Sequence, residues 1–153
     1  MRVFLFLGCL ALFAFSSAGA IANSKPASLD AALANKALVV DFYQQVLFER
    51  NADAIDQFIG DTYIQHNPNL PDGKAALKAL IKALPKPDKA VGKIVRAIAE
   101  GDLVVLHVNY YGWPGPQGGA VVDIFRVADH KIVEHWDVVQ AVPAQSANDN
   151  TMF

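Results

Sequence analysis

The sequence contains little cysteine and shows no excess of basic residues. Its single cysteine, Cys9, cannot form a disulfide within the chain. Thirteen lysines and arginines against 15 aspartates and glutamates give a net charge of −2, whereas a nucleic-acid-binding protein normally carries a basic stripe. The length of 153 residues leaves no room for a second domain of ordinary size. A hydrophobic share of 53% argues against global disorder.

Residues 1–20 have the order of a secretory signal peptide. Arg2 supplies a positive start, residues 3–15 are almost entirely apolar, and the small residues 18–20 suit a cleavage site. Such a short apolar run spans a bilayer poorly, so cleavage after Ala20 is favoured over a membrane anchor. The mature chain would then be periplasmic or secreted, without stable membrane insertion. It would also lack cysteine, which excludes thiol catalysis and thiolate metal sites.

The remaining chain predicts one α+β domain. We expect a lead-in at 21–35, a domain at 36–142 and a loose polar tail at 143–153. Helical spacing of apolar residues predicts helices at about 29–49, 53–59 and 74–84, the last two capped by Asp53 and Asp72. Runs rich in Val, Ile and Tyr predict strands at 62–66, 94–99, 103–111, 120–127 and 132–140. Helices followed by an antiparallel meander predict a curved sheet with helices on one face, enclosing a cone-shaped cavity.

The turn of the last hairpin decides which side chains enter this cavity. A two-residue turn at Asp129-His130 would need positive φ at both residues. A three-residue loop needs positive φ only at His130, and histidine tolerates that region. We therefore favour the longer loop, which places Asp123 opposite His135.

In that register, strand alternation places an imidazole and two carboxylates among apolar residues on the cavity face. This face carries Asp123, Phe125, Val133, His135, Asp137 and Val139. A slip of one residue would exchange the faces and bring Glu134 and Trp136 inside. Acid/base groups with apolar neighbours suit a pocket better than a plain core.

Further histidines and aromatic residues are candidates for the same pocket. His66 ends the short strand just before Asn67-Pro68, and His107 lies in the middle of a long strand. We expect Tyr43, Tyr111 and Trp113 in the pocket wall, with Trp113 on a Gly/Pro loop. The plainer interpretations are a capped turn for His66, a core or interface histidine for His135, and structural aromatic residues.

Two stretches of the sequence have a familiar pattern: 63–68 followed by 72–74, and 122–127 followed by 131–140. Both resemble the SnoaL-like polyketide cyclase family, which has the nuclear-transport-factor-2-like fold. The resemblance covers roughly residues 36–142 and implies an α+β cone with a deep pocket. It is most specific for the group described as predicted aldol-condensation enzymes, and it implies cofactor-free acid/base catalysis by an aspartate and a histidine.

The Asp-x-Phe-Arg sequence at 123–126 also resembles ketosteroid isomerases, which share this fold. In those enzymes the aspartate of this motif lines the pocket and donates to an oxyanion, and Asp123 falls on that position. Their general-base aspartate directly precedes a proline. That position here is Asn67, which is not a base, so a base must come from elsewhere.

Two functions follow from these residues. In the first, Asp137 or Asp123 removes a proton α to a carbonyl, and a carbon–carbon bond forms or a double bond shifts. Protonated His135 or His66 would stabilise the enolate. In the second, the exported pocket binds a small apolar or carbonyl-containing ligand without turnover, or the sheet only dimerises. His66, His107, His135 and a carboxylate could together bind zinc or iron. No spacing motif supports such a site, so we expect no metal and no cofactor.

The outer sheet face predicts a homodimer. Ile124, Trp136 and Val138 would otherwise be exposed apolar surface on this face. No nucleic-acid partner is expected.

Overall fold

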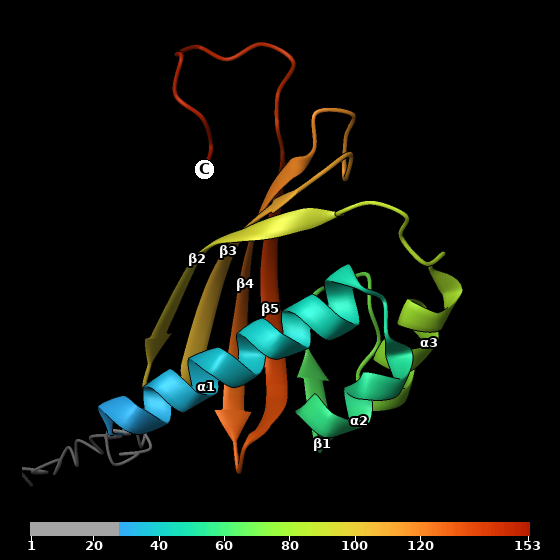
Figure 1. Ribbon diagram of the computed structural model, residues 1–153, viewed down its shortest axis with the longest axis vertical. Coiled ribbons are helices and arrows are strands. Elements are labelled where there is room, and N and C mark those ends of the chain that lie inside the picture. Colours follow the sequence, from blue (N-terminus) through green and yellow to red (C-terminus); the bar gives the residue numbers. More distant parts are fainter. Residues whose placement is uncertain (1–27) are drawn as a thin grey trace, which may run out of the picture.

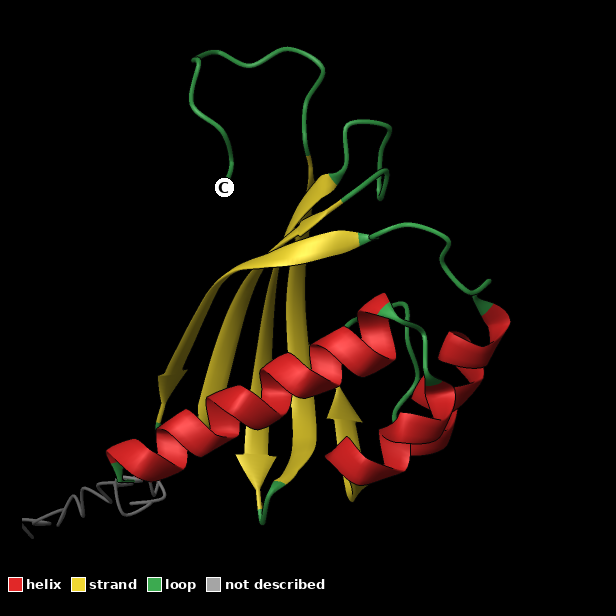
Figure 2. Ribbon diagram, in the orientation of Figure 1, coloured by secondary structure: helices red, strands yellow, loops and turns green. Residues whose placement is uncertain are grey.

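The computed structural model describes residues 28–153 as a curved sheet with helices packed against one face (Figures 1 and 2). The predicted signal peptide at 1–20 and residues 21–27 of the lead-in lie outside the described residues. Within 28–153, no helix is both long and apolar enough to cross a membrane. The α+β architecture predicted from the sequence is confirmed.

The first helix lies across the sheet and supplies one wall of the interior. Helix α1 (Leu29–Phe42) begins at Ser28, whose hydroxyl oxygen accepts a hydrogen bond from the amide of Ala31. It continues without a break into the π-helical segment η1 (Tyr43–Phe48). The predicted helix at 29–49 is therefore confirmed, although its last third has the wider π turn. Such turns often occur at functional sites, and Tyr43 at the start of this one reaches the site described below.

The short helices and the first strand have different caps from those predicted. Segments η2 (Ala52–Ala54) and α2 (Ile55–Phe58) lead into strand β1 (Ile59–Gln65). The cap is Asn51 rather than Asp53, because the Asn51 side chain accepts a hydrogen bond from the Asp53 amide. Strand β1 begins three residues earlier than predicted, with Ile59 fully buried.

The third helix also lacks its predicted cap. Helix α3 (Lys74–Ala83) follows Gly73, whose φ of 94° suits glycine, and no side chain caps its first turn. The Asp72 carboxylate instead accepts a hydrogen bond from the Gln65 amide at 2.7 Å. Asp72 thus ties the loop before α3 to the end of β1.

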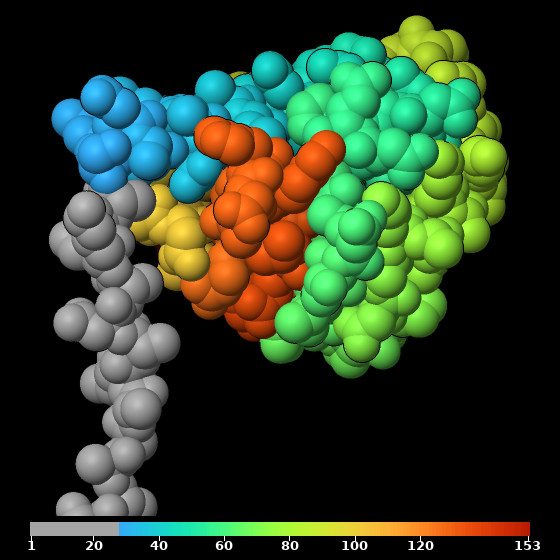
Figure 3. All heavy atoms as spheres, turned by 90° about the horizontal axis from the view of Figure 1, so that it is seen from below, coloured from blue at the N-terminus to red at the C-terminus, as the bar shows by residue number. Residues whose placement is uncertain are grey.

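Five strands form the sheet in the order β1-β5-β4-β3-β2. The long strands are β2 (Gly92–Glu100), β3 (Leu103–Tyr110), β4 (Gly119–Ala128) and β5 (Lys131–Ala141). These four form an antiparallel meander, whereas β1 joins the edge of β5 in parallel. The space-filling view from below shows the β4–β5 turn packed between α1 and β1 (Figure 3).

The predicted three-residue loop between β4 and β5 is wrong. The chain makes the two-residue turn at Asp129 and His130, with φ of 49° and 58°, and Ala128 pairs with Lys131. Val127 pairs with Ile132, but Arg126 pairs with Glu134, so Val133 is the extra residue of a β-bulge. The shorter turn alone would exchange the two faces of β5 relative to β4. The bulge shifts the pairing by one further residue, so Phe125 and His135 again lie on the same face.

The predicted cavity face is therefore largely confirmed. Phe125 pairs with His135 and Asp123 pairs with Asp137, and all four lie on the helix-covered side. Val133 is the exception, because the bulge places Ile132 in the core at 0% exposure instead.

The interior is built around aromatic rings that join the helices to the sheet. The ring of Phe42 meets Phe58 and Phe125 edge-on, with centroids 5.8 and 5.7 Å apart. Edge-to-face packing of this kind adds to the hydrophobic stabilisation of buried rings. These contacts fix α1 over β4 and leave the wider part of the cone open.

Candidate active site

A cavity of about 460 Å³ lies between the helices and the sheet. This volume is in the range of small-molecule sites, and most of the lining side chains are aliphatic or aromatic. The charged and amide side chains in the lining are Arg50, Gln65, Asn67, Asn69, Asp123, His135 and Asp137. A few polar groups in an apolar wall are what orient a ligand in such sites.

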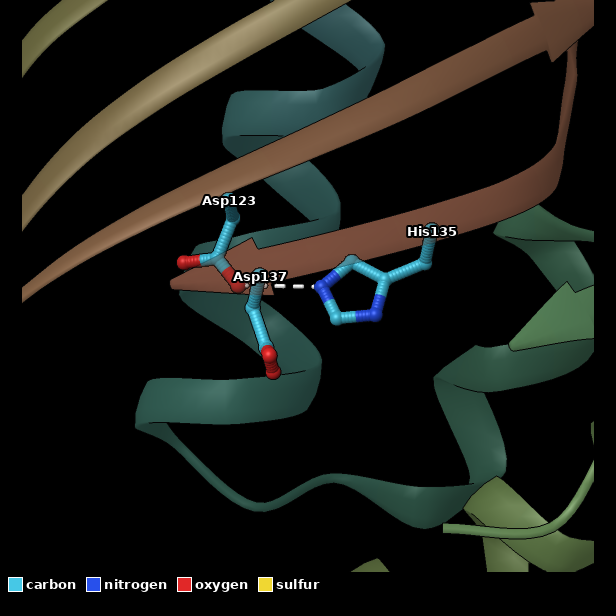
Figure 4. A group of neighbouring side chains, drawn as sticks. All are labelled: Asp123, His135 and Asp137. Carbon is cyan, nitrogen blue, oxygen red and sulfur yellow. Dashed lines mark hydrogen bonds and ion pairs between the residues drawn. The ribbon is translucent and has the colours of Figure 1, made fainter. Parts of the chain in front are cut away.

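Asp123 and His135 lie next to each other in the cavity wall and are only 4% and 7% exposed (Figure 4). Nε2 of His135 lies 3.0 Å from Oδ1 of Asp123. Asp137 lies beside them, and one potential ligand atom from each of the three side chains is within 4.8 Å of the other two. The predicted proximity of these three side chains is confirmed. The predicted direct pairing of Asp123 with His135 is wrong, because the two contact each other diagonally across the ladder.

The second ring nitrogen of His135 is also held by an oxygen acceptor. Nδ1 lies 2.9 Å from Oε1 of Gln65. That oxygen also accepts a hydrogen bond from the Asn67 amide at 2.8 Å, which fixes the orientation of the Gln65 side chain. Both nitrogens therefore face oxygen atoms, and a ring carrying two protons donates to both.

The two carboxylates differ in how many of their oxygens are occupied. Oδ1 of Asp123 is hydrogen-bonded to Nε2 of His135, and its Oδ2 accepts a hydrogen bond from the Tyr43 hydroxyl at 2.8 Å. Asp137 accepts one side-chain hydrogen bond, from Nδ2 of Asn67 to Oδ2 at 2.6 Å. Its Oδ1 has no hydrogen-bond partner among residues 28–153. Asp137 is thus the carboxylate with an oxygen available to a ligand.

Strand β1 and the turn after it supply the polar groups that sequence reasoning missed. Tyr63, Gln65 and Asn67 alternate along this segment and all line the cavity. Asn67 is fixed because its Oδ1 accepts the Asn69 amide at 2.9 Å, which leaves Nδ2 pointing to Asp137. The period-two spacing of 63, 65 and 67 was the available signal.

Buried tyrosines surround the carboxylates and remain protonated. Burial, followed by the negative charge of Asp123, raises the pKa of Tyr43 and Tyr63 above the ordinary value of 10.0. Burial also raises the pKa of Tyr110. The Tyr63 hydroxyl oxygen receives a long hydrogen bond from Gln65, at 3.5 Å. Its own proton is therefore available to a ligand.

The expected place of His66 in the pocket is wrong. Its side chain lies on the outer face, where Nε2 is 2.8 Å from Oε1 of Glu134. Its ring stacks on Trp136, with centroids 4.6 Å apart and planes within 5°. Because residues alternate along β1, His66 points away from the cavity that Gln65 lines.

His107 is likewise absent from the cavity lining. Its Nδ1 lies 2.8 Å from Nη1 of Arg96 on the outer face. Its ring stacks on Phe153, the last residue of the chain, with centroids 5.7 Å apart. The tail expected to be loose therefore returns to the sheet at its end.

The remaining predicted lining residues do face the cavity. Tyr43, Phe125, Tyr111 and Trp113 all line it. The Trp113 side chain is about half exposed and its ring meets Tyr110 at 5.4 Å. Trp113 therefore lies at the rim of the cavity rather than in its depth.

Within residues 28–153, the group that could hold a metal ion is again Asp123, His135 and Asp137. Their nitrogen and oxygen atoms suit a divalent transition metal. Both ring nitrogens of His135 and both oxygens of Asp123 already bond to protein groups, however. A metal ion would have to displace these bonds, so the geometry favours acid/base chemistry.

Comparison with solved structures shows the same fold at low sequence identity. A protein assigned as a ketosteroid isomerase from Kribbella flavida is 17% identical with a TM-score of 0.61, over 76% of this chain and 85% of that one. A protein assigned as a polyketide cyclase from Acidithiobacillus ferrooxidans is 23% identical with a TM-score of 0.54, over 69% and 87%. TsrD from Streptomyces laurentii is 21% identical with a TM-score of 0.55, over 70% and 88%.

Sequence comparison gives the family. No curated protein matches the chain. Residues 39–135 match the model of the SnoaL-like domain, and this segment contains β1, β4 and the first half of β5, with all the polar pocket residues named above except Asp137. The structural neighbours include proteins described as NTF2-like, which agrees with the helix-covered cone. The chain therefore belongs to the SnoaL-like domain family.

Proposed function

We propose that this protein catalyses proton transfer at the carbon α to a carbonyl, in the isomerisation or aldol-type cyclisation of a small ketone without a cofactor. The observation that carries this proposal is the free Oδ1 of Asp137. It has no partner within residues 28–153, whereas Asp123 and His135 have both of their oxygen or nitrogen atoms hydrogen-bonded. A general base needs an unoccupied oxygen within reach of the substrate.

The Asp137 carboxylate takes the α proton through Oδ1. The electron pair of the broken C–H bond forms the carbon–carbon double bond of an enolate, and the negative charge moves to the former carbonyl oxygen. The hydroxyl of Tyr63 donates a hydrogen bond to that oxygen, because its raised pKa keeps it protonated. The proton then returns from Asp137 to another carbon, or to the alkoxide formed when the enolate attacks a second carbonyl.

The pair of Asp123 and His135 prepares this base. Two carboxylates this close repel each other, and the contact of His135 Nε2 with Oδ1 of Asp123 offsets part of that repulsion. His135 has no free nitrogen for a substrate, so its role is to position groups rather than to donate a proton. The Tyr43 hydroxyl donates to the other oxygen of Asp123 from the helix side.

Two further features support the proposal. Structural neighbours are assigned as a polyketide cyclase and as a ketosteroid isomerase, and both names imply enolate chemistry. In addition, Asn67 occupies the place where the isomerases have their base, and here it donates to Asp137 instead. The base would then have moved from the turn after β1 to the facing strand β5.

The experiment measures deuterium uptake at the α carbon, which does not require knowledge of the natural substrate. 1-Indanone, 1-tetralone and cyclohex-3-enone are incubated in D₂O with the protein and followed by proton NMR. We expect exchange above the buffer background, and Asp137→Asn should lower it by about 10²-fold or more. Asp61→Asn, at a fully exposed side chain, is the matched control and should leave the rate unchanged.

The alternative function is non-catalytic binding by the same pocket. It is favoured if wild type and Asp137→Asn bind these ketones equally and neither accelerates exchange. Exchange that survives Asp137→Asn would instead show that another group is the base.

A further inference from the structure

The cavity has a positive charge in its helical wall. Arg50 lines the same cavity as Asp123 and Asp137 but comes from the end of η1, whereas both carboxylates lie on the sheet. Its backbone has a φ of 55°, directly after the helix end at Glu49. Glycine or asparagine is the usual residue at this position of a helix terminus. Arg50 therefore adopts a left-handed backbone conformation that is less favourable for arginine than for glycine.

The Arg50 guanidinium has few protein partners. Its Nη1 donates to the carbonyl oxygen of Pro85. Its Nε is buried and has no acceptor among residues 28–153. It forms no ion pair with an aspartate or glutamate of this part of the chain. A partly buried guanidinium without a carboxylate partner is unfavourable, and an anion bound at its cavity-facing end offsets the charge.

The two walls of the cavity thus carry opposite charges. Tyr110 lies near a charge from each wall. Burial and the charge of Asp123 raise the pKa of its phenol, and the charge of Arg50 lowers it. Between these groups the lining is apolar and includes Phe42, Leu80 and Val121. A ligand that matches this surface has an apolar body, an anionic group at one place and a neutral carbonyl at another.

We propose that Arg50 determines specificity by binding the carboxylate of an apolar, ring-containing organic acid. The planar guanidinium matches a carboxylate with two parallel hydrogen bonds. Arg50 is the only lysine or arginine in the lining formed by residues 28–153, and His135 already bonds to Gln65 and Asp123, so the site suits a monoanion and favours a carboxylate over a phosphate dianion. The assignment of the reacting end to Asp137 rests on the proposed function, whereas anion binding at Arg50 does not.

The test compares two ligands that differ only in charge. Binding of 2-naphthoate and 2-naphthamide is measured by calorimetry at low salt. Wild type is expected to bind the carboxylate about tenfold more tightly or better, as befits a charge-assisted hydrogen bond. Arg50→Gln should remove this preference and leave the affinity for the amide unchanged, and Arg50→Lys should retain part of it.

Arg96→Gln is the matched control, because it removes a positive charge from the outer face without touching the cavity. Its preference should equal that of wild type. Asp137→Asn should also keep the preference for the carboxylate, so a failure of the proposed catalysis leaves this result intact. Equal affinity of wild type for the two ligands would overturn the proposal, as would equal loss of both in Arg50→Gln. If Arg50→Gln does not fold, the wild-type comparison and Arg50→Lys decide the question.

Discussion

At the scale of single residues, the site is defined by hydrogen bonds that are already made. Asp123 and His135 have every side-chain polar atom occupied, and Asp137 alone of the three keeps an oxygen without a partner in the described part of the chain. Two carboxylates with the same chemistry therefore have different tasks, set by their neighbours. The sequence alone left this choice open, because Tyr43 and Asn67 reach the site from distant segments.

The buried tyrosines predict a dependence of stability on alkaline pH. Tyr43, Tyr63 and Tyr110 have pKa values raised in the folded protein, so their stabilising effect is complete below pH 10. It is lost as the pH rises, because the unfolded chain releases these protons first. The free energy of unfolding should fall above pH 10 by up to about 1.4 kcal/mol per pH unit for each tyrosine.

Urea denaturation from pH 9 to pH 11.5 measures this slope. Tyr63→Phe serves as the internal comparison and should make the slope shallower. Absorbance at 295 nm gives an independent reading. Ionisation of all four tyrosines of the folded protein in one step near pH 10 would contradict the prediction.

At the scale of elements, the β4–β5 hairpin shows what the sequence could and could not predict. The alternation of Asp123, Phe125, His135 and Asp137 correctly predicted the cavity face. The turn and the bulge at Val133 were both missed, and each alone would have exchanged the faces. The sequence pattern records which side chains are apolar, whereas the bulge depends on packing that no local pattern reveals.

The same limit explains the other errors. His66 was expected inside because it precedes Asn67-Pro68, yet alternation along β1 sends it to Trp136. Arg50 was not singled out, because a lone arginine after a helix carries no signal until the cavity beside it is known.

The hairpin turn predicts a stabilising double substitution. Asp129 and His130 both have positive φ, and Asn-Gly is the sequence that two-residue turns of this type favour most. Asp129→Asn combined with His130→Gly should stabilise the protein by about 1 kcal/mol. The midpoint of urea unfolding should rise without a change in the slope m. A lower midpoint would mean that the wild-type side chains make contacts that outweigh the backbone strain.

At the scale of the whole molecule, the outer sheet face is partly apolar and lies opposite the cavity. Val138 and Ile98 are 67% and 61% exposed there. Trp136 is partly covered, since His66 stacks on it and Arg126 lies 5.7 Å from its ring centre. The signal peptide predicted at 1–20 stays a prediction, because it lies outside the described residues.

We expect a second copy of the chain to cover this face. Sedimentation velocity at micromolar concentrations should show a dimer, and Val138→Asp should shift it to monomer because a charge would be buried in the interface. Glu100→Gln, at an exposed residue at the end of β2, is the control. A wild-type monomer at high micromolar concentration would remove the idea.

The contact of Phe153 with His107 has a practical consequence. The Phe153 ring lies on the same face where the second copy is expected, so any bulky group attached at this residue would enter the expected interface. Such a group would separate the two copies and would give a monomer whatever the unmodified protein does. Oligomeric state is therefore best measured with Phe153 and its neighbours unmodified.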